Sequence, residues 1–176
     1  MESTREQRFE DLMGVVYGPL QRFVRRRTGD GEDVLADVLL VLWRRLDDVP
    51  ADAALPWSYG VARGCLLNAR RSHERRWKLL RRIAAEPAAP EPAEDPDLAV
   101  ALGALPEADQ EVLRLWAWEG LPPREMAVVR GITANAASLR LHRATIRLRT
   151  ELLGGARKSR PSAGQEPDRQ GKEATR

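Results

Sequence analysis

Cysteine and histidine are scarce in this chain of 176 residues. Its single cysteine, Cys65, excludes an internal disulfide, and the apolar stretch around it favours a buried thiol. The two histidines, His73 and His142, have no spacing to acidic residues or to Cys65 that is typical of a catalytic triad or a metal site. A glycine-rich phosphate loop is also missing. We therefore expect no enzymatic activity, no bound metal and no cofactor.

Long hydrophobic runs are absent as well. No segment approaches the ~18 apolar residues that a membrane-spanning helix needs. The N-terminal segment from Met1 to Glu10 is charged and lacks the apolar core of a secretory signal peptide. These absences predict a cytoplasmic protein that does not insert into a membrane.

Aromatic residues make up only 5% of the chain, although hydrophobic residues make up 43%. The apolar positions are mostly Leu, Val and Ala, which suit helix packing better than the interior of a β-sandwich. They recur at three- and four-residue steps along several segments, which is the spacing of amphipathic helices. The sequence therefore predicts an all-α fold.

The N-terminal half contains three of these periodic segments. The first covers residues 9–24, and Pro19 inside it predicts either a kink or two helices that meet there. The second covers 34–46, after a break at 28–31. The third begins near Trp57, and its expected apolar face is Trp57, Val61, Cys65 or Leu66, and Ala69.

A proline-rich, acidic segment separates the two halves of the chain. Its prolines, at 87, 90, 92 and 96, exclude a continuous helix. Helices are expected beyond it at 98–105, 108–119, 122–130 and 133–153, the second with Val112, Leu115 and Trp116 as its apolar face. The predicted organisation is therefore two small helical domains joined by a flexible linker: residues 1–83, the linker 84–97, residues 98–153, and a disordered tail at 154–176.

The basic residues form two blocks. Residues 63–82 and 134–158 are each rich in Arg, whereas 83–113 contain acidic residues and no Lys or Arg. Two basic segments that flank an acidic one suggest two separate contacts with a polyanion. The alternative is that the arginines are solvated helix faces in a protein from a GC-rich genome.

Residues 124–143 have the spacing of a helix-turn-helix. Two short helices cross closely only where the contact residue is small and the turn tolerates a left-handed backbone, and Ala127 and Gly131 meet these needs. Thr133 is positioned to cap the second helix. The side of this helix opposite its apolar stripe, with the flanking positions, comprises Asn135, Ser138, Leu139, Arg140, His142, Arg143 and Arg147.

Arg and Asn side chains on such a helix suit the edges of guanine and adenine in a major groove, and further arginines suit phosphates. A helical hairpin with a basic outer face also occurs in proteins that do not bind DNA. The spacing alone leaves both possibilities open.

The order of motifs resembles that of the extracytoplasmic-function sigma factors. Residues 105–113, 118–122 and 125–143 are similar to region 4 of that family, including the closing Leu-His-Arg-Ala at 141–144. The N-terminal half resembles region 2 in four segments: 20–23, 31–37, 42–45 and 57–76. Together the two halves cover residues 9–153.

The resemblance implies a function in transcription initiation. Region 2 would bind core RNA polymerase at the β′ clamp helices through Asp33 and Asp37, and the loop 47–56 would capture a flipped-out base of the −10 element. Region 4 would recognise the −35 element through the helix described above. The other implied partners are the polymerase β flap and an anti-sigma factor. The DNA backbone next to the −10 base would be contacted by Arg63, Asn68, Arg71, Arg75 and Arg76.

Two alternatives remain at this stage. One is a helix-turn-helix repressor or activator that does not join polymerase, which leaves the first domain without a task. The other is a helical regulatory adaptor that has lost DNA binding. It is motivated by Ala36 and Leu139, which stand where the family usually has polar residues.

Overall fold

The protein is all-helical across the part of the chain that its computed structural model describes, residues 4–29, 31–80 and 95–158. No strand occurs in these ranges, and none of their helices is long and apolar enough to cross a membrane. The all-α prediction is confirmed. The elements are α1 (Arg5–Arg25), α2 (Gly31–Arg44), a 3₁₀ turn η1 (Leu46–Asp48), α3 (Ala54–Leu80), α4 (Pro96–Gly103), α5 (Glu107–Ala117), α6 (Pro123–Arg130) and α7 (Ala134–Lys158).

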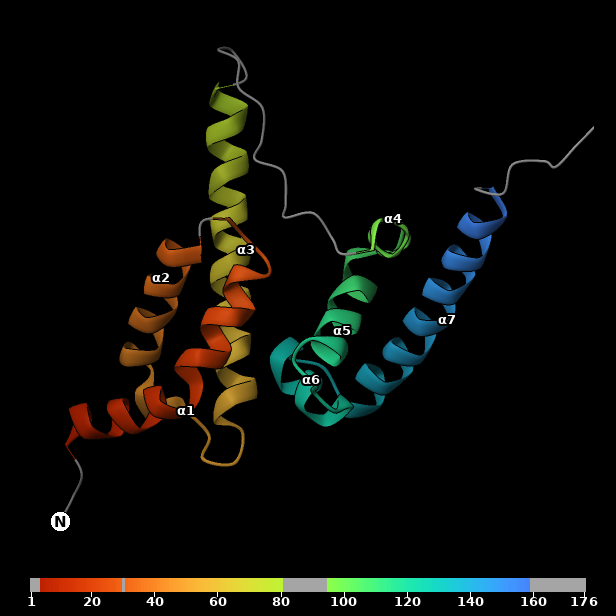
Figure 1. The fold of residues 1–176 in the computed structure, drawn as a ribbon. Coiled ribbons are helices and arrows are strands. Elements are labelled where there is room, and N and C mark those ends of the chain that lie inside the picture. Colours follow the sequence, from red (N-terminus) through yellow and green to blue (C-terminus); the bar gives the residue numbers. More distant parts are fainter. Residues whose placement is uncertain (1–3, 30, 81–94, 159–176) are drawn as a thin grey trace, which may run out of the picture.

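The N-terminal helices α1 and α2 pack against the long helix α3 (Figure 1). Their periodic apolar residues meet in one core, in which the fully buried side chains include Leu20, Phe23, Val38 and Leu42. From α3 the core receives Tyr59 and Ala62, while the residues predicted for its apolar face are only partly buried at the edge. The stripe on α3 was therefore predicted slightly out of phase.

Pro19 lies inside α1 and does not divide it. A proline has no N–H, so the carbonyl of Val15 loses its helical partner, but Val15 is 62% exposed and water can reach it. Val16 and Leu20 are fully buried on either side, and their packing keeps the segment helical. The ribbon of α1 changes direction along its length (Figure 1). Of the two predicted outcomes, the kink is found and the division is not.

The C-terminal half is built around α6 and α7, with α5 packed on both (Figure 1). Gly131 ends α6 with a φ of 63°, a left-handed conformation that favours glycine. The hydroxyl of Thr133 accepts a hydrogen bond from the backbone N–H of Ala136 at 3.2 Å, as predicted for a cap. Buried Ala127, Ala137 and Ala144 allow the helices to approach closely. The predicted helix-turn-helix is present.

Three expectations for this half need correction. The prediction of Trp116 on the buried face of α5 is wrong, because its side chain is 55% exposed and Leu113 is buried instead. Helix α7 continues through Gly154 and Gly155 to Lys158, where a disordered tail was expected. The end of the predicted linker, Pro96 and Asp97, belongs to α4, because Asp95 caps that helix and a proline is tolerated in its first turn. The rest of the linker and tail lies outside the described residues.

Tyr59 gives the fold a measurable response to alkaline pH. Its ring is 3% exposed and stacks on Phe23 with ring centroids 4.7 Å apart. Burial, and after it the negative charge of Glu119, raises the pKa of Tyr59 to about 12 from an ordinary value of 10.0. Because the unfolded phenol ionises first, the stabilisation is complete below pH 10 and is lost as the pH rises through about 12.

We expect the free energy of unfolding of the wild type to fall over this interval more steeply than that of Tyr59→Phe, which has no ionisable ring. Chemical denaturation at a series of pH values checks this. If the two proteins lose stability in parallel, the shift assigned to Tyr59 is wrong.

Candidate nucleic-acid interface

The exposed side of α7 presents four polar side chains and one leucine near the N-terminus of the helix. Its members, here called the outer face of α7, are Asn135, Ser138, Leu139, His142 and Arg143. All five are exposed, and among the described residues none of their side chains makes a hydrogen bond or an ion pair. The first turns of a recognition helix are those that contact base edges. The outer face of α7 is therefore free to bind a ligand.

Arg140 and Arg147 behave differently from the outer face, although the sequence grouped them with it. The Nη1 atom of Arg147 donates a hydrogen bond to Asp109 Oδ2, and Arg140 Nη1 lies 3.7 Å from Asp109 Oδ1. Asp109 belongs to α5 and is only 3% exposed. Two guanidinium groups seven residues apart on α7 thus compensate one buried carboxylate, so both arginines position α7 against α5.

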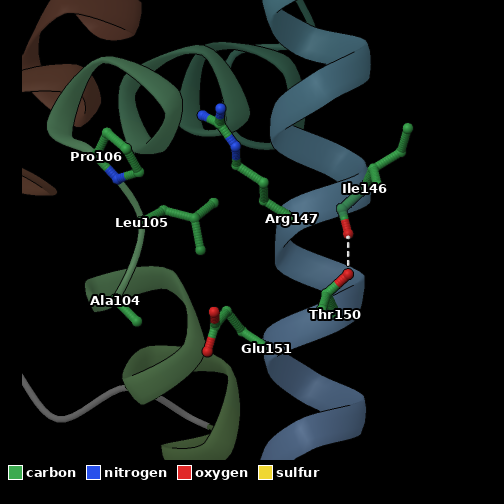
Figure 2. Close-up of a pocket in the computed structure, with 7 residues that line it drawn as sticks. All are labelled: Ala104, Leu105, Pro106, Ile146, Arg147, Thr150 and Glu151. Carbon is green, nitrogen blue, oxygen red and sulfur yellow. Dashed lines mark hydrogen bonds between the residues drawn. The ribbon is translucent and has the colours of Figure 1, made fainter.

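Figure 2 shows this side of α7, where it borders a hollow of about 350 Å³ next to the α4–α5 junction. Leu105 points from the junction toward α7, and Arg147 leaves α7 in the direction of α5. The hydroxyl of Thr150 donates to the carbonyl oxygen of Ile146 at 3.0 Å, within α7 itself. The lining combines Arg147, Thr150 and Glu151 with apolar side chains, and the hollow lies apart from the outer face.

The basic residues of α3 divide into two groups. The exposed group consists of Asn68, Arg71 and Arg75. At 100° per residue, each of these lies within roughly 60° of the next around the helix, so the three share one side of α3. Arg63 is half-buried on the side that faces α6. There it contributes, with Arg140 and after the dominant effect of burial, to lowering the pKa of Arg130. The side chain of Arg76 lies outside the described residues.

Helix α2 exposes a second distinct surface. Asp33, Ala36, Asp37 and Leu40 share its solvent side, and Leu40 is 52% exposed. The sequence predicted the two carboxylates but not the apolar neighbour. The helical period alone would have placed Leu40 on this side, since it follows Asp33 by seven residues and Asp37 by three. The acidic surface of α2 thus contains a hydrophobic side chain that a partner can cover.

The loop 47–56, predicted to capture a base, is held by ion pairs at its first two residues. Asp47 accepts from Arg5 at 3.1 Å and from Arg8 at 3.0 Å, both on α1. Asp48 pairs with Arg45 at 2.8 Å. A hollow of about 460 Å³ lies beyond the loop, between α3 and α6, and its lining includes Arg45, Trp57, Asn68 and Arg130.

Comparison with known proteins identifies the C-terminal half. Residues 97–148, from α4 into α7, match the family model described as sigma-70, region 4. A probable RNA polymerase sigma factor, RfaY, of Xanthomonas campestris pv. campestris is 31% identical over 144 residues, covering 74% of this chain. The chain is therefore similar to sigma factors of RNA polymerase, and residues 97–148 to their region 4. It spans only 36% of the length of RfaY, so the activity of that whole protein does not transfer directly.

Solved structures show that the fold is shared beyond region 4. The sigma factor RpoE of Bartonella quintana, in complex with the anti-sigma factor NepR, matches with a TM-score of 0.63 at 23% identity, over 83% of this chain and 96% of that one. CnrH, in complex with the cytosolic domain of CnrY, gives 0.57 at 24% identity over 83% and 88%. PhyRSL of Sphingomonas sp. Fr1, in complex with NepR, gives 0.61 at 16% identity over 96% and 98%.

These findings confirm the predicted resemblance to sigma factors. They assign α4–α7 to region 4, and α7 is the second helix of its helix-turn-helix. The fold likeness extends to α1–α3, because the matched structures cover four fifths or more of the chain. The individual base, phosphate and polymerase contacts remain predictions.

Proposed function

We propose that this chain is a sigma factor, which directs RNA polymerase to specific promoters and assists in opening them. The observation that supports this most strongly is the pairing of two surfaces on separate helical groups. The outer face of α7 has free polar side chains, and α2 exposes two carboxylates beside Leu40. Each small module would bind weakly alone, and joint attachment through polymerase would raise the effective concentration of the other.

In this proposal the outer face of α7 recognises the −35 element. Asn135 and Arg143 suit adenine and guanine edges, and Leu139 suits a thymine methyl group. Asn68, Arg71 and Arg75 on α3 would follow the backbone of the −10 strand. The energy for melting would come from trapping unstacked bases and from polymerase contacts, so the chain itself breaks no covalent bond. Acting with polymerase, it would work in the cytoplasm.

The acidic side of α2 is the proposed contact with core polymerase. Reversing one charge there, Asp33→Lys or Asp37→Lys, is expected to weaken binding to core polymerase about tenfold, because repulsion replaces attraction at an interface edge. Binding of the isolated chain to −35 DNA should be unchanged. Titration of labelled core polymerase measures the first effect. Glu10→Lys, an exposed reversal on α1, serves as the control for net charge.

In vitro transcription with sigma-free core polymerase and fragmented genomic DNA tests the function as a whole. Discrete start sites that share two motifs at a fixed spacing are expected. DNA binding without any association with core polymerase would instead indicate a repressor or activator.

The regulatory adaptor is the second candidate, and the exposure of Leu139 favours it. This side chain is 45% exposed in the middle of the outer face, where a protein partner would bury it as readily as DNA. A DNA-binding chain should show log affinity falling with log salt at about −0.9 per neutralised phosphate, whereas an adaptor should show almost no DNA affinity. Because RpoE was solved with an anti-sigma factor, a protein of that kind is also a proposed partner here.

A further inference from the structure

The apolar stripe of α1 ends in two arginines. Phe9, Leu12 and Val16 pack into the N-terminal core, and the positions that would continue their stripe toward the N-terminus hold Arg5 and Arg8. Both arginines lie in the first two turns of α1, where the partial positive charge of a helix N-terminus disfavours cations. Arg5 and Arg8 therefore serve contacts outside α1 and not the helix itself.

Arg5 closes the end of α2. Its Nη2 atom donates to the carbonyl oxygen of Trp43 at 2.8 Å. This carbonyl belongs to the last turn of α2, where carbonyls lack a helical donor and the negative end of the helix favours a cation. The Arg5 guanidinium also lies 5.3 Å from the centre of the Trp43 ring, which Phe9 meets edge-on with ring centroids 5.2 Å apart. The start of α1 is thus fixed to the point where the chain leaves α2 (Figure 1).

The same two arginines hold Asp47, the first residue of the loop 47–56. Arg5 donates to Asp47 Oδ2 at 3.1 Å and Arg8 donates to Oδ1 at 3.0 Å, so both carboxylate oxygens are engaged. The side chains of Arg5, Arg8 and Asp47 are 42%, 47% and 63% exposed, and ion pairs as exposed as these contribute little to folding stability. Their effect is local, because they fix the direction in which the backbone enters the loop.

The far end of the loop is held by separate contacts. The backbone N–H of Ala53 donates to the carbonyl oxygen of Pro50 at 3.2 Å, and α3 follows directly. Arg45, just after α2, lies with its guanidinium 5.0 Å from the centre of the Trp57 ring on α3. The tip of the loop, residues 51–52, is exposed between these two fixed ends.

We propose that Arg5 and Arg8 are positioning residues for base capture: through Asp47 they hold the loop 47–56 in the conformation that receives an unstacked −10 base. The inference rests on the proposed function, which includes the trapping of unstacked bases. A loop that is held before binding loses less conformational entropy when DNA orders it, so its affinity for a single strand rises without a new DNA contact. In this role neither arginine touches DNA.

Residue-resolved amide hydrogen exchange of the full chain tests the contact without DNA. Asp47→Asn should raise the exchange rates of the Val49 and Ala53 amides, which are hydrogen-bonded within the loop, by about tenfold. The amides of the buried core should exchange as in the wild type, because the ion pairs are exposed. Asp47→Glu keeps the charge and should leave the loop protected. Faster exchange throughout α1–α3, or unchanged exchange in the loop, would overturn the positioning role.

Single-stranded DNA binding by the chain in complex with core polymerase tests the consequence. The probes are labelled oligonucleotides with either strand of the −10 element found upstream of the start sites in the transcription experiment. Asp47→Asn should weaken binding of the captured strand about tenfold. Simple attraction to phosphates predicts the opposite sign, because the variant removes a negative charge. Glu10→Gln removes the same charge from an exposed position on α1 and should bind no more weakly than the wild type.

A background without the two arginines isolates their contribution. In Arg5→Gln/Arg8→Gln the contact is already lost, so adding Asp47→Asn should change affinity by less than about twofold. An equal effect of Asp47→Asn in both backgrounds, or unchanged or tighter binding by Asp47→Asn alone, would overturn the proposal. Absence of initiation and of DNA binding by every protein, the wild type included, would refute the proposed function and base capture with it, whereas the exchange of the loop amides still decides whether α1 holds the loop.

Discussion

Replacing Phe23 by alanine is expected to lower the free energy of unfolding by about 3–5 kcal/mol. Phe23 is fully buried, its ring stacks on Tyr59 of α3, and the Arg27 guanidinium lies 3.6 Å from the centre of the same ring. Truncation would leave a cavity between α1 and α3 that rigid helices cannot close. Chemical denaturation monitored by circular dichroism measures the loss.

The same helix supplies a matched control for this substitution. Tyr17 also belongs to α1 but is 43% exposed, so Tyr17→Ala should cost less than about 1 kcal/mol. Similar losses for the two alanine variants would mean that the buried stack contributes no special stability.

Replacing Arg143 by alanine is expected to weaken binding to −35 DNA by up to about a hundredfold, since a good bidentate contact to a base contributes about 1–3 kcal/mol. Arg143 is exposed on the outer face of α7 and has no ion pair among the described residues, so its removal leaves no buried charge behind. The measurement is fluorescence anisotropy with cognate and scrambled duplexes. Specific binding should fall more than non-specific binding.

Two further arginines of α7 provide control variants for this prediction. Arg149→Ala removes the same charge from an exposed position farther along the helix, and it should change affinity only slightly. Arg140→Ala should reduce stability as well as binding, because Asp109 keeps Arg147 but loses its second cation. Equal effects of Arg143→Ala and Arg149→Ala would argue for general electrostatic attraction instead of base recognition.

In the proposed function, the separation of these roles would let a chain of this size bind two DNA sites. Region 4 is held together by its own contacts, including Asp109 with Arg147, and these do not involve the outer face of α7. The contact between the helical groups uses other residues, chiefly Arg27 and Glu119. Substitutions can therefore alter docking, folding or recognition separately.

Local features of the sequence were sufficient to predict the helices and the helix-turn-helix. Apolar spacing, the left-handed glycine at 131 and the cap at Thr133 act within a few residues of one another, so a linear pattern records them. The exposure of the outer face of α7 followed from the same 100° rotation per residue. The family was recognisable for this reason, because its motifs are short and occur in a fixed order.

Only the tertiary structure decided which of the predicted residues are available and which serve the fold. Arg140 and Arg143 look equivalent in sequence, but Asp109, 31 residues before Arg140, binds the first and not the second. The helical period of the apolar residues predicted a buried Trp116. Leu113 is buried instead, because α6 and α7 pack on α5 from another side. The pairing of Arg27 with Glu119 across 92 residues has no local signal at all. Such contacts depend on how helices dock, and a period describes each helix separately.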